Sequence, residues 1–151
     1  MFKKQGVLLL MGLLFLIFGF PAELVLSAET APVSLKPCPS SPNCVSSLAE
    51  DSKHRTDPFP LSGTTAETLT LLVRAIETIP RATLRQQGAL YLKAEFRTSL
   101  GFVDDLEFLV DEAQGVVQVR SASRTGYWDL GVNRKRVEAL RRVYSEMAEK
   151  K

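Results

Sequence analysis

The chain has 151 residues, of which 45% are hydrophobic and 24% charged, with a formal net charge of +2. This length indicates one domain, and so small a net charge excludes a strong electrostatic attraction to nucleic acid. The sequence has no P-loop, no dinucleotide-binding glycine motif and no G-x-S-x-G nucleophile motif, and its single histidine, His54, lies in a proline-rich stretch. We therefore predict no cofactor, no metal site and no catalytic serine triad.

The N-terminus predicts an export signal over residues 1–28. Two lysines precede an apolar run over 7–20, which is shorter than the roughly 20 residues that span a bilayer and suits a signal-peptide core. We expect cleavage after Ala28, although Leu26 stands where a small residue is preferred. The protein is then exported, to a periplasm, to a thylakoid lumen or to the medium. If the segment is retained, the protein is membrane-anchored and faces outward.

Residues 29–62 are predicted to be irregular, because six of the eight prolines lie there. This segment also holds Cys38 and Cys44, the only two cysteines, and we expect them to form a structural disulfide in an exported protein. Zinc sites and redox-active pairs usually have the shorter C-x-x-C spacing. A thiol-redox role is kept as an alternative.

Residues 63–151 are predicted to form an α+β core, which makes one domain with the preceding segment. Thr64 and Glu67 suit a capping box at the start of a helix that Pro80 ends. A final amphipathic helix starts near Asn133. Between the helices, strands are expected at 82–86, 90–98, 102–111 and 116–123. The predicted fold is two-layered: a helix, a four-stranded antiparallel meander and a second helix, with both helices on one face of the sheet.

The four-residue loop at 112–115 predicts the pairing of the last two strands. It sets Asp111 opposite Val116 and therefore Asp104 opposite Ser123, so that the core face of the sheet becomes polar at one end. The other face is expected to carry a lattice of cross-strand ion pairs. Its predicted members are Lys93, Arg97, Asp105, Glu107 and Arg120.

The segment 120–136, RSASRTGYWDLGVNRKR, meets the polar end of the sheet. Arginine forks can bind a carboxylate or phosphate, and a helix N-terminus adds free N–H groups. We therefore predict a pocket for a small acidic ligand. The candidate ligand-binding residues are Asp104, Ser121, Ser123, Arg124, Tyr127, Asp129, Asn133 and Arg134.

A structural interpretation of the same residues stays open. Asp129 or Asn133 would then cap the last helix, and Arg124 would neutralise Asp104. Tyr127 and Trp128 would cover the open end of the core.

Three motifs carry a resemblance to a known family. CPSSPNCVSS at 38–47, GFVDDLEF at 101–108 and RSASRTGYWDLGVNRKRVE at 120–138 together resemble the domain of unknown function 1499 family, over about residues 35–145. The resemblance implies a domain that often follows an export or membrane segment, and it implies no activity. Trp128 stands where the resemblance implies a smaller residue.

The sequence thus predicts a non-catalytic exported module that binds a small acidic ligand or a partner protein through its Arg124–Arg134 end. One alternative is a hydrolase-like enzyme that uses Asp104 with Arg124, and the other is the thiol-redox protein. No nucleic-acid partner is expected. Membrane contact is expected only through the N-terminal segment, if that segment is retained.

Overall fold

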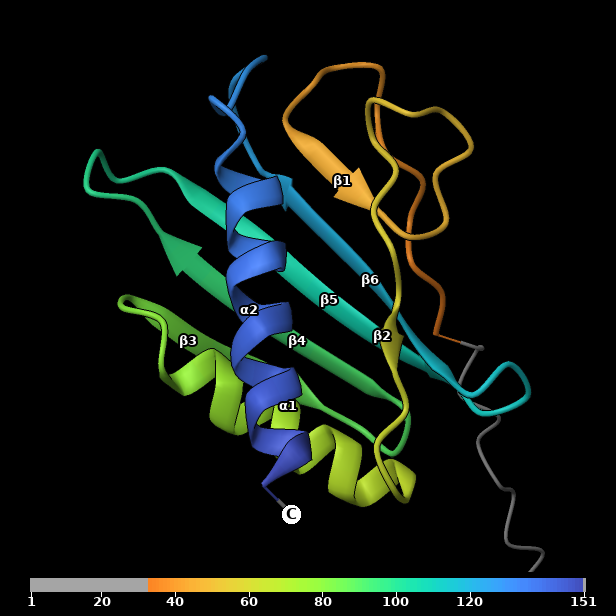
Figure 1. The fold of residues 1–151 in the computed structure, drawn as a ribbon. Coiled ribbons are helices and arrows are strands. Elements are labelled where there is room, and N and C mark those ends of the chain that lie inside the picture. Colours follow the sequence, from red (N-terminus) through yellow and green to blue (C-terminus); the bar gives the residue numbers. More distant parts are fainter. Residues whose placement is uncertain (1–32, 151) are drawn as a thin grey trace, which may run out of the picture. The chain divides into compact units, whose positions relative to one another are not determined.

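The computed structural model describes residues 33–150, so the predicted signal segment at 1–28 lies outside the described residues. The elements are β1 (Cys44–Ser46), β2 (Phe59–Pro60), α1 (Thr65–Glu77), β3 (Ala82–Gln87), β4 (Tyr91–Arg97), β5 (Val103–Asp111), β6 (Val116–Ser123) and α2 (Val132–Glu149) (Figure 1). None of the helices within 33–150 is long and apolar enough to cross a membrane.

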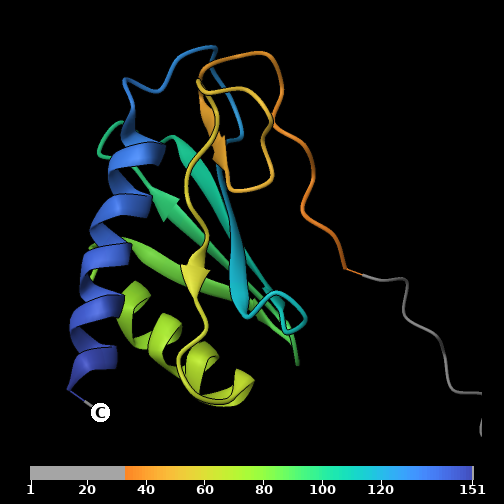
Figure 2. The ribbon, with the colours of Figure 1, turned by 45° about the vertical axis from the view of Figure 1, so that its right-hand side comes forward.

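The strands form one antiparallel sheet in the order β1-β6-β5-β4-β3, with β2 also paired to β6. Strands β3 to β6 are the predicted meander, and α1 and α2 pack on the same face of the sheet (Figures 1 and 2). The two-layer α+β prediction is confirmed. The sequence prediction missed β1 and β2, because strands of three and two residues in a proline-rich segment carry no alternating pattern of their own.

The predicted strand register and helix start are also confirmed. Asp111 pairs with Val116 and Asp104 with Ser123, and burial alternates along the whole of β5. At the start of α1, Thr64 and Glu67 form the reciprocal capping box.

The core between the helices and the sheet includes an aromatic side chain from the proline-rich segment. Phe59 is fully buried and makes edge-to-face contacts with Phe108 and Tyr144, at centroid distances of 5.1 and 5.6 Å. The Tyr144 hydroxyl donates to the carbonyl of Pro60 at 2.8 Å. The guanidinium of Arg141 lies 4.4 Å from the centre of the Phe59 ring. The segment before α1 is therefore part of the same packed domain.

Candidate functional site

A cavity of about 260 Å³ opens at the end of the sheet where the β4–β5 turn meets the β6–α2 loop. We call it the Trp128 cavity. Its lining residues are Thr98, Ser99, Leu100, Phe102, Asp104, Ser123, Thr125, Gly126, Trp128, Asp129, Leu130 and Val132.

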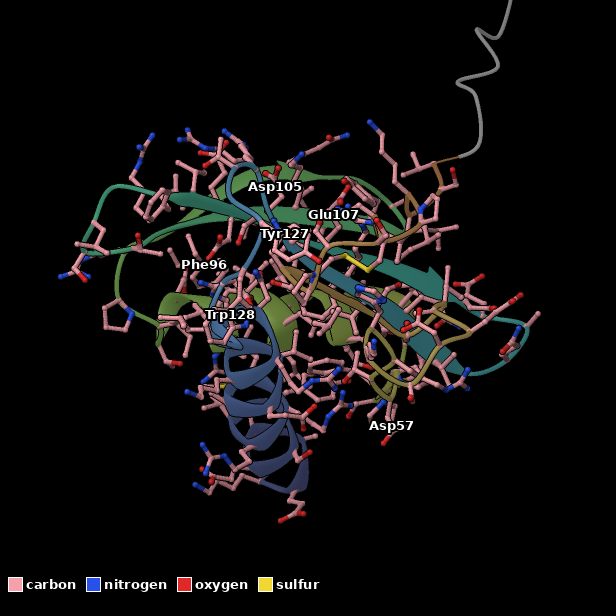
Figure 3. All side chains as sticks on the ribbon, turned by 90° about the horizontal axis from the view of Figure 1, so that it is seen from above. Asp57, Phe96, Asp105, Glu107, Tyr127 and Trp128 are labelled. Carbon is pink, nitrogen blue, oxygen red and sulfur yellow. A yellow bond between two sulfur atoms is a disulfide. The ribbon has the colours of Figure 1, made fainter. Side chains whose placement is uncertain are left out.

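Large apolar side chains around this cavity are exposed to solvent. Leu100 is 83% exposed, Trp128 66%, Leu130 64% and Phe102 48%. Single exposed apolar residues are ordinary, but several that surround one concavity mark an interaction site. Figure 3 shows Trp128 over the start of α2, and most of its side chain is exposed to solvent.

The inner wall of the cavity contains a buried carboxylate. Asp104 is only 1% exposed, and its Oδ2 accepts a hydrogen bond from Arg136 Nη2 at 2.6 Å. The Arg136 guanidinium also lies 4.6 Å from the centre of the Phe96 ring. No described residue donates a hydrogen bond to the other oxygen, Asp104 Oδ1.

Asn133 connects the residues behind the cavity. Its side chain is fully buried, and its Oδ1 accepts from Ser121 Oγ at 2.5 Å and from Arg136 Nη1 at 2.9 Å. Its Nδ2 donates to Asp129 Oδ2, to Ser123 Oγ and to the Asn43 carbonyl, at 2.8, 3.0 and 3.2 Å. A side chain with this many partners holds the wall together and has no group left for a ligand.

The N-cap of α2 is Gly131, and Asp129, two residues earlier, accepts from the backbone at the start of this helix. Its two carboxylate oxygens accept from the backbone N–H groups of Gly131 and Asn133, both at 2.9 Å. Leu130 and Gly131 both have positive φ angles, 56° and 74°, which turn the chain into the helix. The Asp129 carboxylate and carbonyl therefore already engage the N–H groups of Gly131, Val132 and Asn133, which an anion here would otherwise contact.

The disulfide loop contacts the β6–α2 loop, which lines the cavity. Cys38 and Cys44 form the predicted bond, with Cα atoms 5.7 Å apart. Next to it, Asn43 Nδ2 donates to the carbonyl of Gly126 at 2.5 Å, and the Asn43 carbonyl accepts from the backbone N–H of Ser123 at 3.0 Å. The loop that carries Trp128 is thus tied to residues more than 80 positions earlier in the chain.

The predicted pair of Arg124 and Asp104 is wrong. Arg124 Nε and Nη2 bind both oxygens of Asp105, at 3.0 and 2.8 Å, and Nη2 also contacts Glu95. Adjacent residues on a strand point to opposite faces, so a contact with Asp105 directs Arg124 away from Asp104. The hydrolase-like pair predicted from the sequence is therefore not assembled.

Arg134 also lies outside the cavity lining. Its Nη1 and Nη2 donate to the carbonyls of Arg55 and Lys53, at 2.8 and 2.7 Å. It connects the start of α2 to the proline-rich segment, which is a structural role.

The predicted ion-pair lattice is present on the sheet face that the helices leave open (Figure 3). Arg120 pairs with Glu107 and Lys93 with Asp105, whereas Arg97 forms no ion pair with any residue in 33–150. Hydrogen bonds from Arg124 and Arg85 hold the pKa of the Glu95 carboxyl below its ordinary value. Burial raises the pKa of Asp105, but Arg124 and Lys93 outweigh this effect and lower it overall.

The structure thus brings together five of the eight predicted residues: Asp104, Ser121, Ser123, Asp129 and Asn133. Tyr127 is 74% exposed and does not line the cavity. The prediction missed Arg136, although it lies three positions after Asn133 and hence on the same face of α2. It also missed Asn43 and the apolar rim, for which no pattern in the sequence gave a signal. Among residues 33–150, no group of acidic, histidine or cysteine side chains could hold a metal ion.

Comparison with known proteins agrees with the resemblance seen in the three motifs. A family described as "Protein of unknown function (DUF1499)" matches residues 34–143, most of the chain. No curated protein matches the chain.

Proposed function

The chain belongs to the domain of unknown function 1499 family, and we propose that this member is a non-catalytic module that binds an apolar ligand in the Trp128 cavity. The observation that carries the proposal is the ring of exposed Leu100, Phe102, Trp128 and Leu130 around one concavity. Ligand sites are concave and mainly apolar, with a few polar groups that orient the ligand. Hydrogen bonds among Ser121, Asn133, Asp129, Asp104 and Arg136 hold the wall behind the cavity, which suits a preformed site.

The proposal keeps the predicted binding role and replaces the predicted acidic ligand. That expectation rested on Arg124 and Arg134, and both guanidiniums are engaged elsewhere. The predicted alternative of a partner protein applies to the same loop, because Tyr127, which precedes Trp128 in the chain, is also exposed. A protein partner would need Tyr127, whereas a small ligand inside the cavity would not.

We further propose that the protein is exported. The apolar run at 7–20 and the Cys38–Cys44 disulfide support this location, because disulfides persist mainly in oxidising compartments. A mature chain that begins at Glu29, seen by mass spectrometry of the protein purified from its host, would establish cleavage after Ala28.

Trp128 is the only tryptophan in the chain, so its fluorescence reports on the cavity directly. Titration with octanol is expected to shift the emission of Trp128 to shorter wavelength in a saturable way. By calorimetry, Trp128→Ala should weaken octanol binding by about tenfold or more, since it removes the largest apolar contact.

Tyr127→Ala is the matched control, because this neighbouring aromatic side chain is equally exposed but lies outside the cavity lining. It should leave octanol affinity unchanged. Equal losses in both variants, or no saturable binding by the wild-type protein, would refute the proposed site.

A further inference from the structure

The charged groups of the Trp128 cavity distinguish between kinds of ligand. Its lining includes the carboxylates of Asp104 and Asp129 and no lysine or arginine. Arg136 balances Asp104 from behind, and the N-terminus of α2 faces Asp129. The cations near the cavity are thus separated from its interior by the carboxylates. An anionic head group would meet like charge there, without a cationic partner.

Asp104 also offers an unused acceptor. Its Oδ2 is bound to Arg136, but Oδ1 accepts no hydrogen bond from the described residues although the side chain is only 2% exposed. Within residues 33–150 the fully buried side-chain atom without a partner is Arg120 Nε, so Asp104 Oδ1 retains contact with solvent at the cavity wall. A hydrogen bond from a charged donor to a carboxylate is among the stronger ones in proteins. A ligand that donates a hydrogen bond at this point would therefore gain more than one that does not.

The apolar rim is compatible with the same kind of ligand. Leu100 and Leu130 provide aliphatic contacts, and the Trp128 and Phe102 rings can attract a cation through their faces. A cavity of about 260 Å³ lies just below the usual range for sites of drug-sized molecules, about 300–1,000 Å³, so it suits one short chain.

The geometry points to a small amphiphilic amine as the ligand: a short apolar body against Trp128 and Leu130, with an ammonium head that donates to Asp104 Oδ1. This inference rests on the proposed function and specifies its ligand class. Asp104 would act here as a specificity-determining residue and not as a catalytic one.

The test compares three probes with the same chain and different heads: octylammonium, octanol and octanoate, each titrated against the full protein by Trp128 fluorescence. Octylammonium should bind about tenfold or more tightly than octanoate, with octanol between them, as expected for one charge-assisted hydrogen bond. Equal affinities for the three probes, or tighter binding of octanoate, would overturn the amine inference. Either result would leave the proposed apolar site intact. If no probe binds, both proposals fail.

Asp104→Asn tests the residue itself. The variant should lose the preference for octylammonium over octanoate, so that the affinities for these two probes approach each other. Asp57→Asn is the control, because Asp57 is an exposed carboxylate far from the cavity (Figure 3). If Asp104→Asn does not fold, the probe series on the wild-type protein still decides the question. A folded Asp104→Asn that keeps the full preference would refute the assignment.

Discussion

At the scale of single residues, the candidate site depends on which charges neutralise one another. Asp104 is a buried carboxylate at the polar end of the core, and Arg136 supplies its counter-charge at 2.6 Å. The Arg136 side chain is itself only 8% exposed, so the pair is well shielded from water. Burying such a pair costs solvation energy, and removing only one partner leaves an uncompensated charge in the interior.

We therefore predict that Arg136→Met destabilises the fold by about 3–5 kcal/mol, because Asp104 would remain buried without a cation. Urea unfolding would measure the change in free energy. Arg142→Met is the control on the same helix, since Arg142 is exposed, and should change stability by no more than about 0.5 kcal/mol. Similar stability of the two variants would mean that the Asp104–Arg136 pair does not hold the wall of the cavity.

At the scale of elements, the outer face of β4, β5 and β6 is a lattice of cross-strand ion pairs. Arg124 joins Glu95 on β4 to Asp105 on β5, and these contacts raise the pKa of its guanidinium further. The Tyr91 hydroxyl donates to Glu107 at 2.6 Å, and burial together with this carboxylate raises the pKa of Tyr91. Arg124, which the sequence suggests as a ligand-binding residue, instead connects neighbouring strands of the sheet.

This lattice predicts a specific acid sensitivity. The pKa values of Glu95 and Asp105 are lowered in the folded protein, from ordinary values of 4.5 and 3.8. The unfolded chain therefore binds more protons than the folded one as the pH falls below about 4.5. The stabilisation is complete above that pH and is lost as the pH drops through the lowered pKa values of the folded state.

The double variant Glu95→Gln, Asp105→Asn should show a flatter decline of unfolding free energy from about pH 5 to pH 3 than the wild-type protein. Thermal unfolding at a series of pH values would record it. Glu77→Gln, which alters an exposed carboxylate at the end of α1, should leave the wild-type slope unchanged. A double variant as acid-sensitive as the wild type would contradict the role assigned to these two carboxylates.

At the scale of the whole molecule, the proline-rich segment completes both the core and the site. It adds β1 and β2 to the edge of β6, places Phe59 between the sheet and α2, and brings Asn43 to the loop that carries Trp128. The domain thus extends well before the start of α1.

Phe59→Ala should destabilise the protein by about 3–5 kcal/mol, because it leaves a cavity between Phe108 and Tyr144. Phe102→Ala removes an equally large ring that is 48% exposed, and it should cost less than about 1 kcal/mol. Urea unfolding of both variants tests the comparison. A tolerated Phe59→Ala would show that the segment adds little to the core.

Local sequence patterns were enough to predict the strands and the loop that surround the candidate site. The loop at 112–115 and the alternation of β5 set the register that puts Asp104 opposite Ser123, because a slip by one residue would expose Leu106 and Phe108. The polar end of the core face followed from this register, and the helical pattern after Asn133 placed Asp129 just before α2. These features depend on neighbours in sequence or on one hairpin.

The sequence by itself therefore determined the family, the meander, both helices and the place where the core becomes polar. Only the tertiary structure decided which arginine meets Asp104, since Arg124, Arg134 and Arg136 are chemically equivalent and differ only in the faces from which they project. It also decided that Leu100 and Leu130 meet at one rim, because the turn and the loop that carry them come together only when the sheet and α2 pack. The sequence predicted the polar end of the core, and long-range packing determined that the cavity there has an apolar rim and a carboxylate, Asp104, in its inner wall.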